Sequence, residues 1–209
     1  MMTDLWLKKW DDRYDQEKYA YGVEPNEFFK NQLKKLNAGR ALFAAEGEGR
    51  NAVFAAMLGW EAFAFDISKS GKFKAMSLAE NKNVKIDYRI GNLPDLNFLN
   101  ESFDVVALIY AHFPPNIKSK YHELLSEKLK KGGHVIFEAF GKKHLEYRNA
   151  DENVGGPSNL DALFSIDELN DDFKNFEIIL LEEKVVDLRE GLYHNGKGSV
   201  VRFVGKKLK

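Results

Sequence analysis

The residues best suited to chemistry lie in the stretch LFAAEGEGRNAVFAA, residues 42–56. An apolar run is interrupted there by Gly47 and Gly49 and by Glu46 and Glu48, and apolar residues then resume at helical spacing. Glycine has no Cβ, so it lets a backbone come close to a ligand. The pattern predicts a ligand-binding loop between a buried strand and a helix.

A nucleotide-binding motif runs through this loop. Gly47, Gly49 and Ala52 satisfy G-x-G-x-x-G/A, and Asp66 lies where a ribose-binding acid is expected. The motif alone fits NAD, a flavin nucleotide or S-adenosylmethionine about equally. Asp66 could instead cap the next helix; we favour ribose binding.

The two glutamates separate these ligands. A pyrophosphate beside Glu46 and Glu48 would be repelled by ~4 kcal/mol per unit charge at about 4 Å, for an effective dielectric constant near 20. S-adenosylmethionine carries an ammonium and a sulfonium, which carboxylates attract. The loop therefore predicts a cationic ligand.

The elements that must position this loop alternate along the chain. Strand patterns cover 40–45, 61–66, 84–90, 103–110 and 134–140, and helix patterns cover 28–36, 50–58, 71–81 and the stretch from Pro114 to about Leu129. Such alternation predicts a parallel sheet with helices on both faces. Two more strands, 176–188 and 198–206, flank YHNGKG, whose Asn195-Gly196 pair is typical of hairpin turns. We expect a single α/β domain over 1–209: a doubly wound, mostly parallel seven-stranded, Rossmann-like sheet with a C-terminal antiparallel hairpin.

The composition excludes several classes of partner and chemistry. Lys and Arg number 31 against 32 Asp and Glu, so nothing suggests a nucleic-acid or membrane partner. The absence of cysteine excludes disulfides, zinc–thiolate clusters and thiol nucleophiles, and we expect no metal. The N-terminus has no apolar signal segment, and VVALIYA at 105–111 is too short to cross a bilayer. We expect a cytoplasmic monomer or weak homodimer that acts on a small molecule.

The sequence EGEGRNAVFAAMLGWEAFAFDIS, residues 46–68, resembles the first motif of class I S-adenosylmethionine-dependent methyltransferases. It is most similar to the small bacterial branch near the tellurite-resistance methyltransferases, in which G-x-G-R-N is typical. RYDQEKYAYGVEPNEF, YAHFPP, LKKGGHVIFEAF, GGP and GLYHNGKG resemble further signatures of that branch. The resemblance implies transfer of a methyl group to N, O, S or a chalcogen of a small acceptor. It places these residues at the cofactor: Glu46, Gly47, Glu48, Gly49, Asn51, Asp66, Ile67, Asn92, Leu93 and Ile109.

The sequence departs from this family at Phe43 and Ala45, where class I enzymes commonly carry an acid and a further glycine. Glu46 is then expected to receive the methionine ammonium in place of the acid. A domain that binds S-adenosylmethionine as a sensor, without turnover, is the main alternative function. A nicotinamide-dependent oxidoreductase is the second alternative, and the loop carboxylates argue against it.

Other residues are candidates for the acceptor site. His112 in YAHFPP is either bonded to the loop backbone or serves as a substrate contact or base. Segment 1–30 is expected to close over the cofactor as a lid, with Arg13, Tyr14 and Tyr21 near the ligand, and the irregular stretch 141–164 is expected to shape the acceptor side. Arg50 is expected to pair with Glu46 or Glu48, or to contact an anionic substrate. For Tyr193 and His194 we prefer a surface turn, with substrate contact as the alternative.

Overall fold

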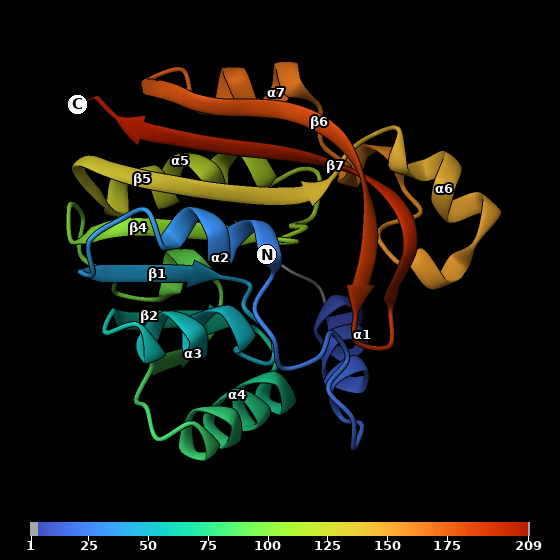
Figure 1. Ribbon diagram of the computed structural model, residues 1–209, viewed down its shortest axis with the longest axis horizontal. Coiled ribbons are helices and arrows are strands. Elements are labelled where there is room, and N and C mark those ends of the chain that lie inside the picture. Colours follow the sequence, from blue (N-terminus) through green and yellow to red (C-terminus); the bar gives the residue numbers. More distant parts are fainter. Residues whose placement is uncertain (1–3, 209) are drawn as a thin grey trace.

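Seven strands form one sheet in the order β3-β2-β1-β4-β5-β7-β6, as Figure 1 shows for the computed structural model of the chain. The structure describes residues 4–208, so the first three residues of the expected lid lie outside the described part. The strands are β1 (Arg40–Ala44), β2 (Glu61–Asp66), β3 (Asp87–Ile90), β4 (Phe103–Ile109), β5 (Leu129–Phe140), β6 (Phe176–Glu190) and β7 (His194–Lys207). The helices are α1 (Asp4–Tyr14), α2 (Glu27–Leu33), α3 (Arg50–Met57), α4 (Lys69–Asn81), α5 (Lys118–Lys128), α6 (His144–Ala150) and α7 (Ile166–Asp172), with short 3-10 turns η1 (Leu93–Asp95), η2 (Glu152–Val154) and η3 (Leu160–Ala162).

The topology confirms the expected doubly wound sheet. Strands β1 to β5 are parallel, and β7 runs antiparallel between β5 and β6. The chain moves outward from β1 in one direction to β2 and β3, and then returns to place β4 on the other side of β1. Ligands of such sheets bind beyond the carboxyl ends of the strands at this reversal.

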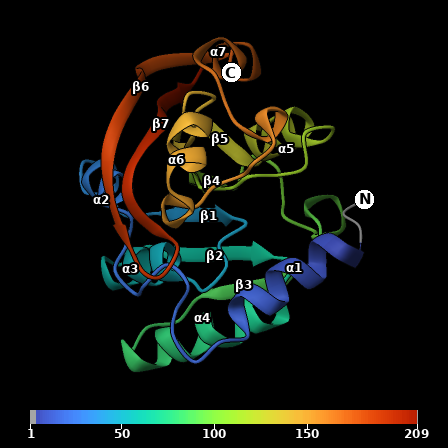
Figure 2. The same cartoon turned by 90° about the vertical axis from the view of Figure 1, so that its right-hand side faces the viewer.

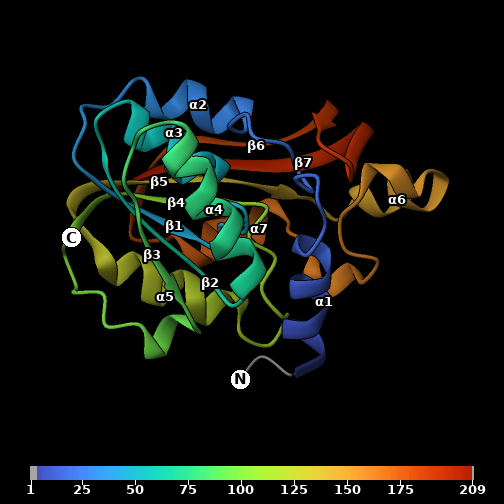
Figure 3. The ribbon, with the colours of Figure 1, turned by 90° about the horizontal axis from the view of Figure 1, so that it is seen from below.

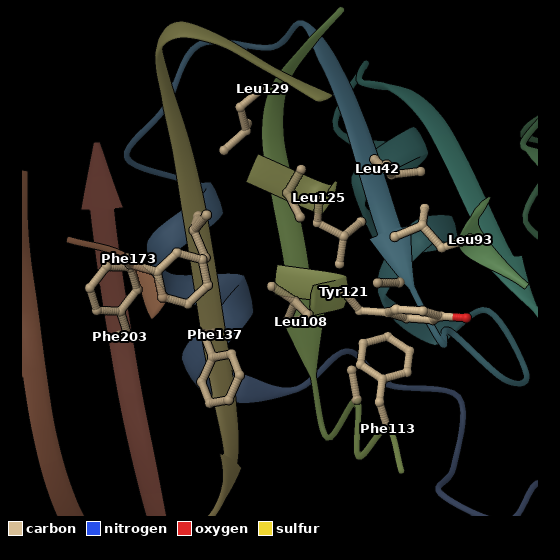
Figure 4. Packing of buried hydrophobic residues seen from close by; sticks show 14 of the residues in the cluster. Leu42, Leu93, Leu108, Phe113, Tyr121, Leu125, Leu129, Phe137, Phe173 and Phe203 are labelled. Atoms are coloured by element: carbon tan, nitrogen blue, oxygen red, sulfur yellow. The ribbon is translucent and has the colours of Figure 1, made fainter. Parts of the chain in front are cut away.

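Helices cover both faces because successive strand residues point to opposite sides. In β1, Leu42 and Ala44 belong to the core under α5 and α7, whereas Ala41 and Phe43 belong to the core under α2, α3 and α4. Figure 3 shows the two helical layers with the sheet between them. Figure 4 shows part of the first core, in which Phe173, directly after α7, stacks on Phe203 of β7 with ring centroids 4.7 Å apart.

Three local predictions were wrong. Strand β5 begins at Leu129, whereas the predicted strand began at residue 134. The hairpin turn lies at residues 191–193, because Asn195 and Gly196 pair with β6 as part of β7. The stretch 141–164 is only partly irregular, since it contains α6, η2 and η3.

The N-terminal segment lies at the carboxyl end of the parallel strands. Figure 2 shows α1 beside α4. The backbone N–H of Leu192 in the hairpin donates to the carbonyl of Ala20 at 2.8 Å, which joins this segment to the tip. Within residues 4–208, no helix is both long and apolar enough to cross a membrane.

Candidate functional site

A cavity of about 540 Å³ opens at the carboxyl ends of β1, β2 and β4, where the strand order reverses. This volume lies within the range of about 300–1,000 Å³ usual for small-molecule sites. Its walls come from the β1–α3 loop, the ends of β2 and β4, α1, the stretch between α6 and η3, and the hairpin tip. The elements that the sequence linked to cofactor and acceptor thus meet around one cavity.

Glu46 lines this cavity from the β1–α3 loop. Its Oε1 atom accepts from the backbone N–H groups of Asn51 and Ala52, both at 2.8 Å. The carboxyl therefore satisfies the first turn of α3, whose N-cap residue Gly49 has no side chain to do so. Burial raises the pKa of Glu46 to about 7 despite these bonds. A cation bound beside this carboxyl would lower its pKa and stabilise its ionised form near neutral pH.

Asp66 provides a second carboxyl to the cavity, at the end of β2. Its Oδ2 accepts from the N–H of Gly47 at 3.0 Å and its Oδ1 from the N–H of Ser68 at 2.9 Å. Burial raises the pKa of Asp66 to about 6. The side-chain cap of α4 is Ser68, whose hydroxyl accepts from the N–H of Gly71, so the alternative of Asp66 as N-cap is wrong.

The two glycines do not line the cavity. Gly47 has φ of 61°, and a Cβ there would lie 2.5 Å from the Oη of Tyr14. Gly49 has φ of 84°, and its Cβ would lie 2.5 Å from the Cβ of Ala75. Because Gly47 and Gly49 have no side chains, α1 can pack on the loop and α3 can pack on α4. The two glycines therefore position the loop without contacting the cavity.

Glu48 also lies outside the cavity lining, contrary to its expected cofactor contact. Its Oε2 accepts from the N–H of Ala20 at 2.8 Å, and its Oε1 pairs with the ammonium of Lys74 at 2.9 Å. The side chain is buried and anchors the N-terminal segment to α4. Glu48 thus stabilises the fold, and the charge argument for the ligand rests on Glu46 alone.

The remaining expected cofactor residues divide in the same way. Asn51, Ile67 and Ile109 line the cavity, whereas Asn92 and Leu93 do not. Leu93 is buried in the core. The buried Oδ1 of Asn92 has no hydrogen-bond partner in the described part of the chain.

Two residues with left-handed backbones flank the reversal point. Ala45, after β1, has φ of 49°, and Tyr110, after β4, has φ of 53°. Both line the cavity. Non-glycine residues adopt this conformation at a cost of order 1–3 kcal/mol, and such strain clusters at functional sites. Ala45 stands where class I methyltransferases commonly carry a glycine, and its backbone adopts the left-handed conformation that glycine favours. The alanine therefore does not prevent the loop from adopting this conformation.

His112 lines the cavity with both ring nitrogens engaged. Its Nε2 accepts from the N–H of Phe140 at 3.4 Å, so Nδ1 carries the proton and donates to the carbonyl of Ala162 at 2.9 Å. Burial lowers the pKa of His112 to about 3. The geometry favours the structural alternative for this residue over the role of base.

Arg50 lines the cavity but pairs with neither loop glutamate. Its Nη2 lies 3.0 Å from Oε2 of Glu190, which also accepts from Nδ1 of His194 at 3.0 Å. The expected partners, Glu46 and Glu48, were therefore wrong. His194 is buried and lines the cavity, so the preferred placement of this histidine in a surface turn was also wrong.

The aromatic N-terminal segment covers one side of the cavity. Trp10 stacks on Tyr14 with centroids 5.7 Å apart, and both line the cavity. The guanidinium of Arg13 lies 3.8 Å from the ring centroid of Tyr193 and donates to the hydroxyl of Tyr21 at 3.3 Å. The expected lid residues Arg13, Tyr14 and Tyr21 thus lie at the cavity, and Arg13 joins α1 to the hairpin tip.

Sequence reasoning missed Glu190 and left Tyr110, Phe140 and Arg148 unassigned. Tyr110, Phe140 and Arg148 line the cavity, and Glu190 lies behind His194. The signal for the hairpin part of the site was GLYHNGKG, residues 191–198. The hairpin bends over the end of the sheet, and no local pattern encodes that approach.

Comparisons with known proteins agree with this geometry. Residues 41–133 match the family model of a methyltransferase domain. No curated protein matches the chain in sequence. The fold is shared with solved structures that are 15–18% identical: a protein studied for the conversion of a disulfide bond into a thioacetal group in echinomycin biosynthesis, a SAM-dependent methyltransferase from Methanosarcina mazei, and TehB from Haemophilus influenzae.

The superposition extends over nearly all of this chain. The echinomycin protein has a TM-score of 0.77 at 16% identity, with 97% of this chain and 92% of that chain covered. The M. mazei protein gives 0.66 at 18% identity, with 89% and 99% covered. TehB gives 0.71 at 15% identity, with 96% and 66% covered. These likenesses, all below 20% identity, establish a shared fold, and one of the proteins that share it is described as a SAM-dependent methyltransferase.

Proposed function

We propose that this chain is a methyltransferase that uses S-adenosylmethionine to methylate a small molecule. The observation that carries the proposal is the convergence of two carboxyls with raised pKa values, Glu46 and Asp66, on one cavity at the reversal point of the sheet. Each would become more favourably ionised beside a cation or a hydrogen-bond donor. A dinucleotide pyrophosphate would meet the carboxyl of Glu46 with repulsion.

The residues at hand fit this cofactor. Glu46 would receive the ammonium of its methionine part, and Asp66 would accept from its ribose hydroxyls. When bound, S-adenosylmethionine supplies an electrophilic methyl group on a positively charged sulfur.

The aromatic side chains that line the cavity would attract the positively charged sulfur of the cofactor and exclude water. Trp10, Tyr14, Tyr21 and Tyr110 line the cavity from three different elements. Ring faces attract cations by about 0.5–2 kcal/mol each, depending on solvent exposure. The protein's main contribution to the rate would be to hold acceptor and methyl group in line, which can supply several kcal/mol of the barrier reduction.

A methyl-transfer assay tests this function. The protein is incubated with S-adenosylmethionine labelled in the methyl group and with a panel of phenols, thiols, amines, tellurite and selenite. The last two follow from the motifs shared with the tellurite-resistance branch. We expect labelled product with at least one acceptor class, and a strong reduction in the Asp66→Ala variant. Tight cofactor binding with no transfer to any class would favour the sensor function instead.

We also propose that the protein acts as a monomer or weak homodimer in the cytoplasm. The near balance of 31 basic and 32 acidic residues supports a small-molecule acceptor over a nucleic acid. Light scattering during size-exclusion chromatography measures the oligomeric state directly.

A further inference from the structure

A histidine and a carboxylate form a pair at the tip of the β6–β7 hairpin. Nδ1 of His194 lies 3.0 Å from Oε2 of Glu190. The same carboxylate pairs with Arg50 at 3.0 Å and accepts from the Nδ2 of Asn26 at 3.0 Å. Glu190 is therefore held from three sides and in turn holds the ring of His194.

This arrangement sets the tautomer of the imidazole. Arg50 and His194 lower the pKa of Glu190 to about 2 although burial opposes them, so the carboxylate is ionised and can only accept. Nδ1 must then carry the proton, which leaves the lone pair on Nε2. Burial lowers the pKa of His194, so the ring is neutral near pH 7.

His194 lies at the wall of the cavity. His194 and Gly155 both line the cavity, and a Cβ on Gly155 would lie 2.8 Å from Cδ2, the atom next to Nε2. Within the described chain, no hydrogen-bond partner is found for Nε2. His112 and His144 differ, because each has both nitrogens bonded to backbone groups.

The surroundings of His194 are aromatic. Its ring centroid lies 4.5 Å from that of Tyr21, 4.5 Å from that of Tyr110 and 5.1 Å from that of Phe140. A base in such surroundings suits an acceptor with an apolar body, since a strongly hydrated one would lose its water shell there.

We propose that His194 is the general base of the acceptor site, that Glu190 is its positioning residue, and that the acceptor carries a hydroxyl or thiol on an apolar body. The proposal rests on the proposed methyltransferase function and extends it to the acceptor. The acceptor's oxygen or sulfur forms a bond to the methyl carbon while the bond from that carbon to the sulfonium sulfur breaks, and the electron pair stays on that sulfur. The acceptor's proton passes to Nε2 of His194, and it leaves to solvent after the product departs.

The first test compares two acceptors that differ in their need for a base. Phenol is protonated at pH 7.5 and pentafluorophenol is ionised. We expect His194→Gln to lower kcat/KM for phenol by about 100-fold or more and to leave kcat/KM for pentafluorophenol nearly unchanged. His134→Gln, at the opposite end of the sheet in β5, is the matched control and should change neither. Equal losses for both acceptors, or no loss for either, would overturn the role of base. Methylation of amines or tellurite without any methylation of phenols and thiols would overturn the acceptor class.

The second test needs no turnover. Nitrogen NMR of the protein saturated with S-adenosylhomocysteine reports which ring nitrogen of His194 carries a proton. We expect the Nδ1–H tautomer from pH 6.5 to 8.5 and a change of tautomer or of pKa in Glu190→Gln. A proton on Nε2 at pH 7.5 would overturn the proposal. Calorimetric binding of S-adenosylhomocysteine, measured beforehand, distinguishes this failure from failure of the methyltransferase function itself.

Discussion

Oδ2 of Asp66 accepts a hydrogen bond from the backbone N–H of Gly47 at 3.0 Å. This bond joins the end of β2 to the loop after β1, and Oδ1 of the same carboxyl holds the N–H of Ser68 at 2.9 Å. One side chain therefore braces two loops while it lines the cavity. Its removal should affect both ligand binding and folding.

Asp66→Ala tests this double role. Each hydrogen bond to a charged group contributes about 1.5–3 kcal/mol, and water entering the space recovers part of the loss. We expect roughly 10- to 1,000-fold weaker binding of S-adenosylhomocysteine, at tenfold per 1.4 kcal/mol, together with a lower Tm. Asp104→Ala is the control, because Asp104 also accepts a backbone N–H, that of Arg40 at 2.8 Å, but at the other end of the sheet. It should lower Tm and bind normally. Full affinity in a folded Asp66→Ala protein would remove this residue from the site.

Glu46→Gln tests the partly buried carboxyl of Glu46 through the pH dependence of stability. The pKa of Glu46 is about 7 in the folded protein against an ordinary 4.5, so the folded state favours the protonated form. Its stabilising contribution is present below pH 4.5 and is lost as the pH rises through 7. At about 1.4 kcal/mol per pKa unit, the free energy of unfolding of the wild type should fall by roughly 3 kcal/mol relative to Glu46→Gln between pH 4.5 and 8. Urea unfolding of both proteins at several pH values measures this difference, and parallel pH profiles would contradict the assignment.

Cofactor affinity should change with pH in the opposite direction. The ammonium of S-adenosylmethionine requires an ionised Glu46, so affinity should increase from pH 6 to pH 8. The increase should be smaller in Glu46→Gln, in which only Asp66, with a pKa of about 6, still ionises over this range. Calorimetric titrations across this range measure it, and affinity in the wild type that is independent of pH would exclude an ionised Glu46 from the ligand site.

Glu48→Ala should destabilise the fold through the N-terminal segment. The substitution leaves the N–H of Ala20 without its acceptor and Lys74 without its buried partner. Breaking such a buried pair destabilises by roughly 3 kcal/mol. Glu61→Ala, which breaks an exposed pair with Arg40, should lose less than about 1 kcal/mol. Equal losses in the two variants, measured by urea unfolding, would contradict the anchoring role.

Ligand binding should protect the two covers of the cavity from proteases. Trp10 and Tyr14 of α1 and Gly155 and Gly156 between η2 and η3 line the cavity, so a ligand would contact both segments. We expect saturating S-adenosylhomocysteine to slow limited proteolysis within residues 4–30 and 141–164. Unchanged cleavage of both segments would contradict their role as lids.

The sheet could be predicted from sequence because burial imposes simple patterns. The bounds of β2, Glu61–Asp66, agree with the predicted strand, since alternating apolar residues and a terminal acid mark both ends. The hairpin turn could not be placed, because Asn195-Gly196 is a strong local signal that the pairing of Glu190 with His194 overrides. Long-range pairing decides such cases.

Site residues that belong to one local motif could be predicted from the sequence. Site residues that are brought together from distant segments could not. Glu46 and Asp66 were identified from motif spacing and line the cavity. Glu48 has the same local context as Glu46, but Ala20 and Lys74 engage it from outside the loop. The Glu190–His194 pair depends on the bend of the hairpin over the sheet end, which residue spacing does not encode.

Calorimetric titration with S-adenosylmethionine and S-adenosylhomocysteine, against NAD and NADP, tests the central claim most directly. We propose that the carboxyl of Glu46, which lines the cavity, favours a cationic ligand over a pyrophosphate. We predict micromolar dissociation constants for the two sulfur ligands, about −8 kcal/mol, and much weaker binding of both dinucleotides. Tighter binding of NAD or NADP than of S-adenosylmethionine would contradict the account.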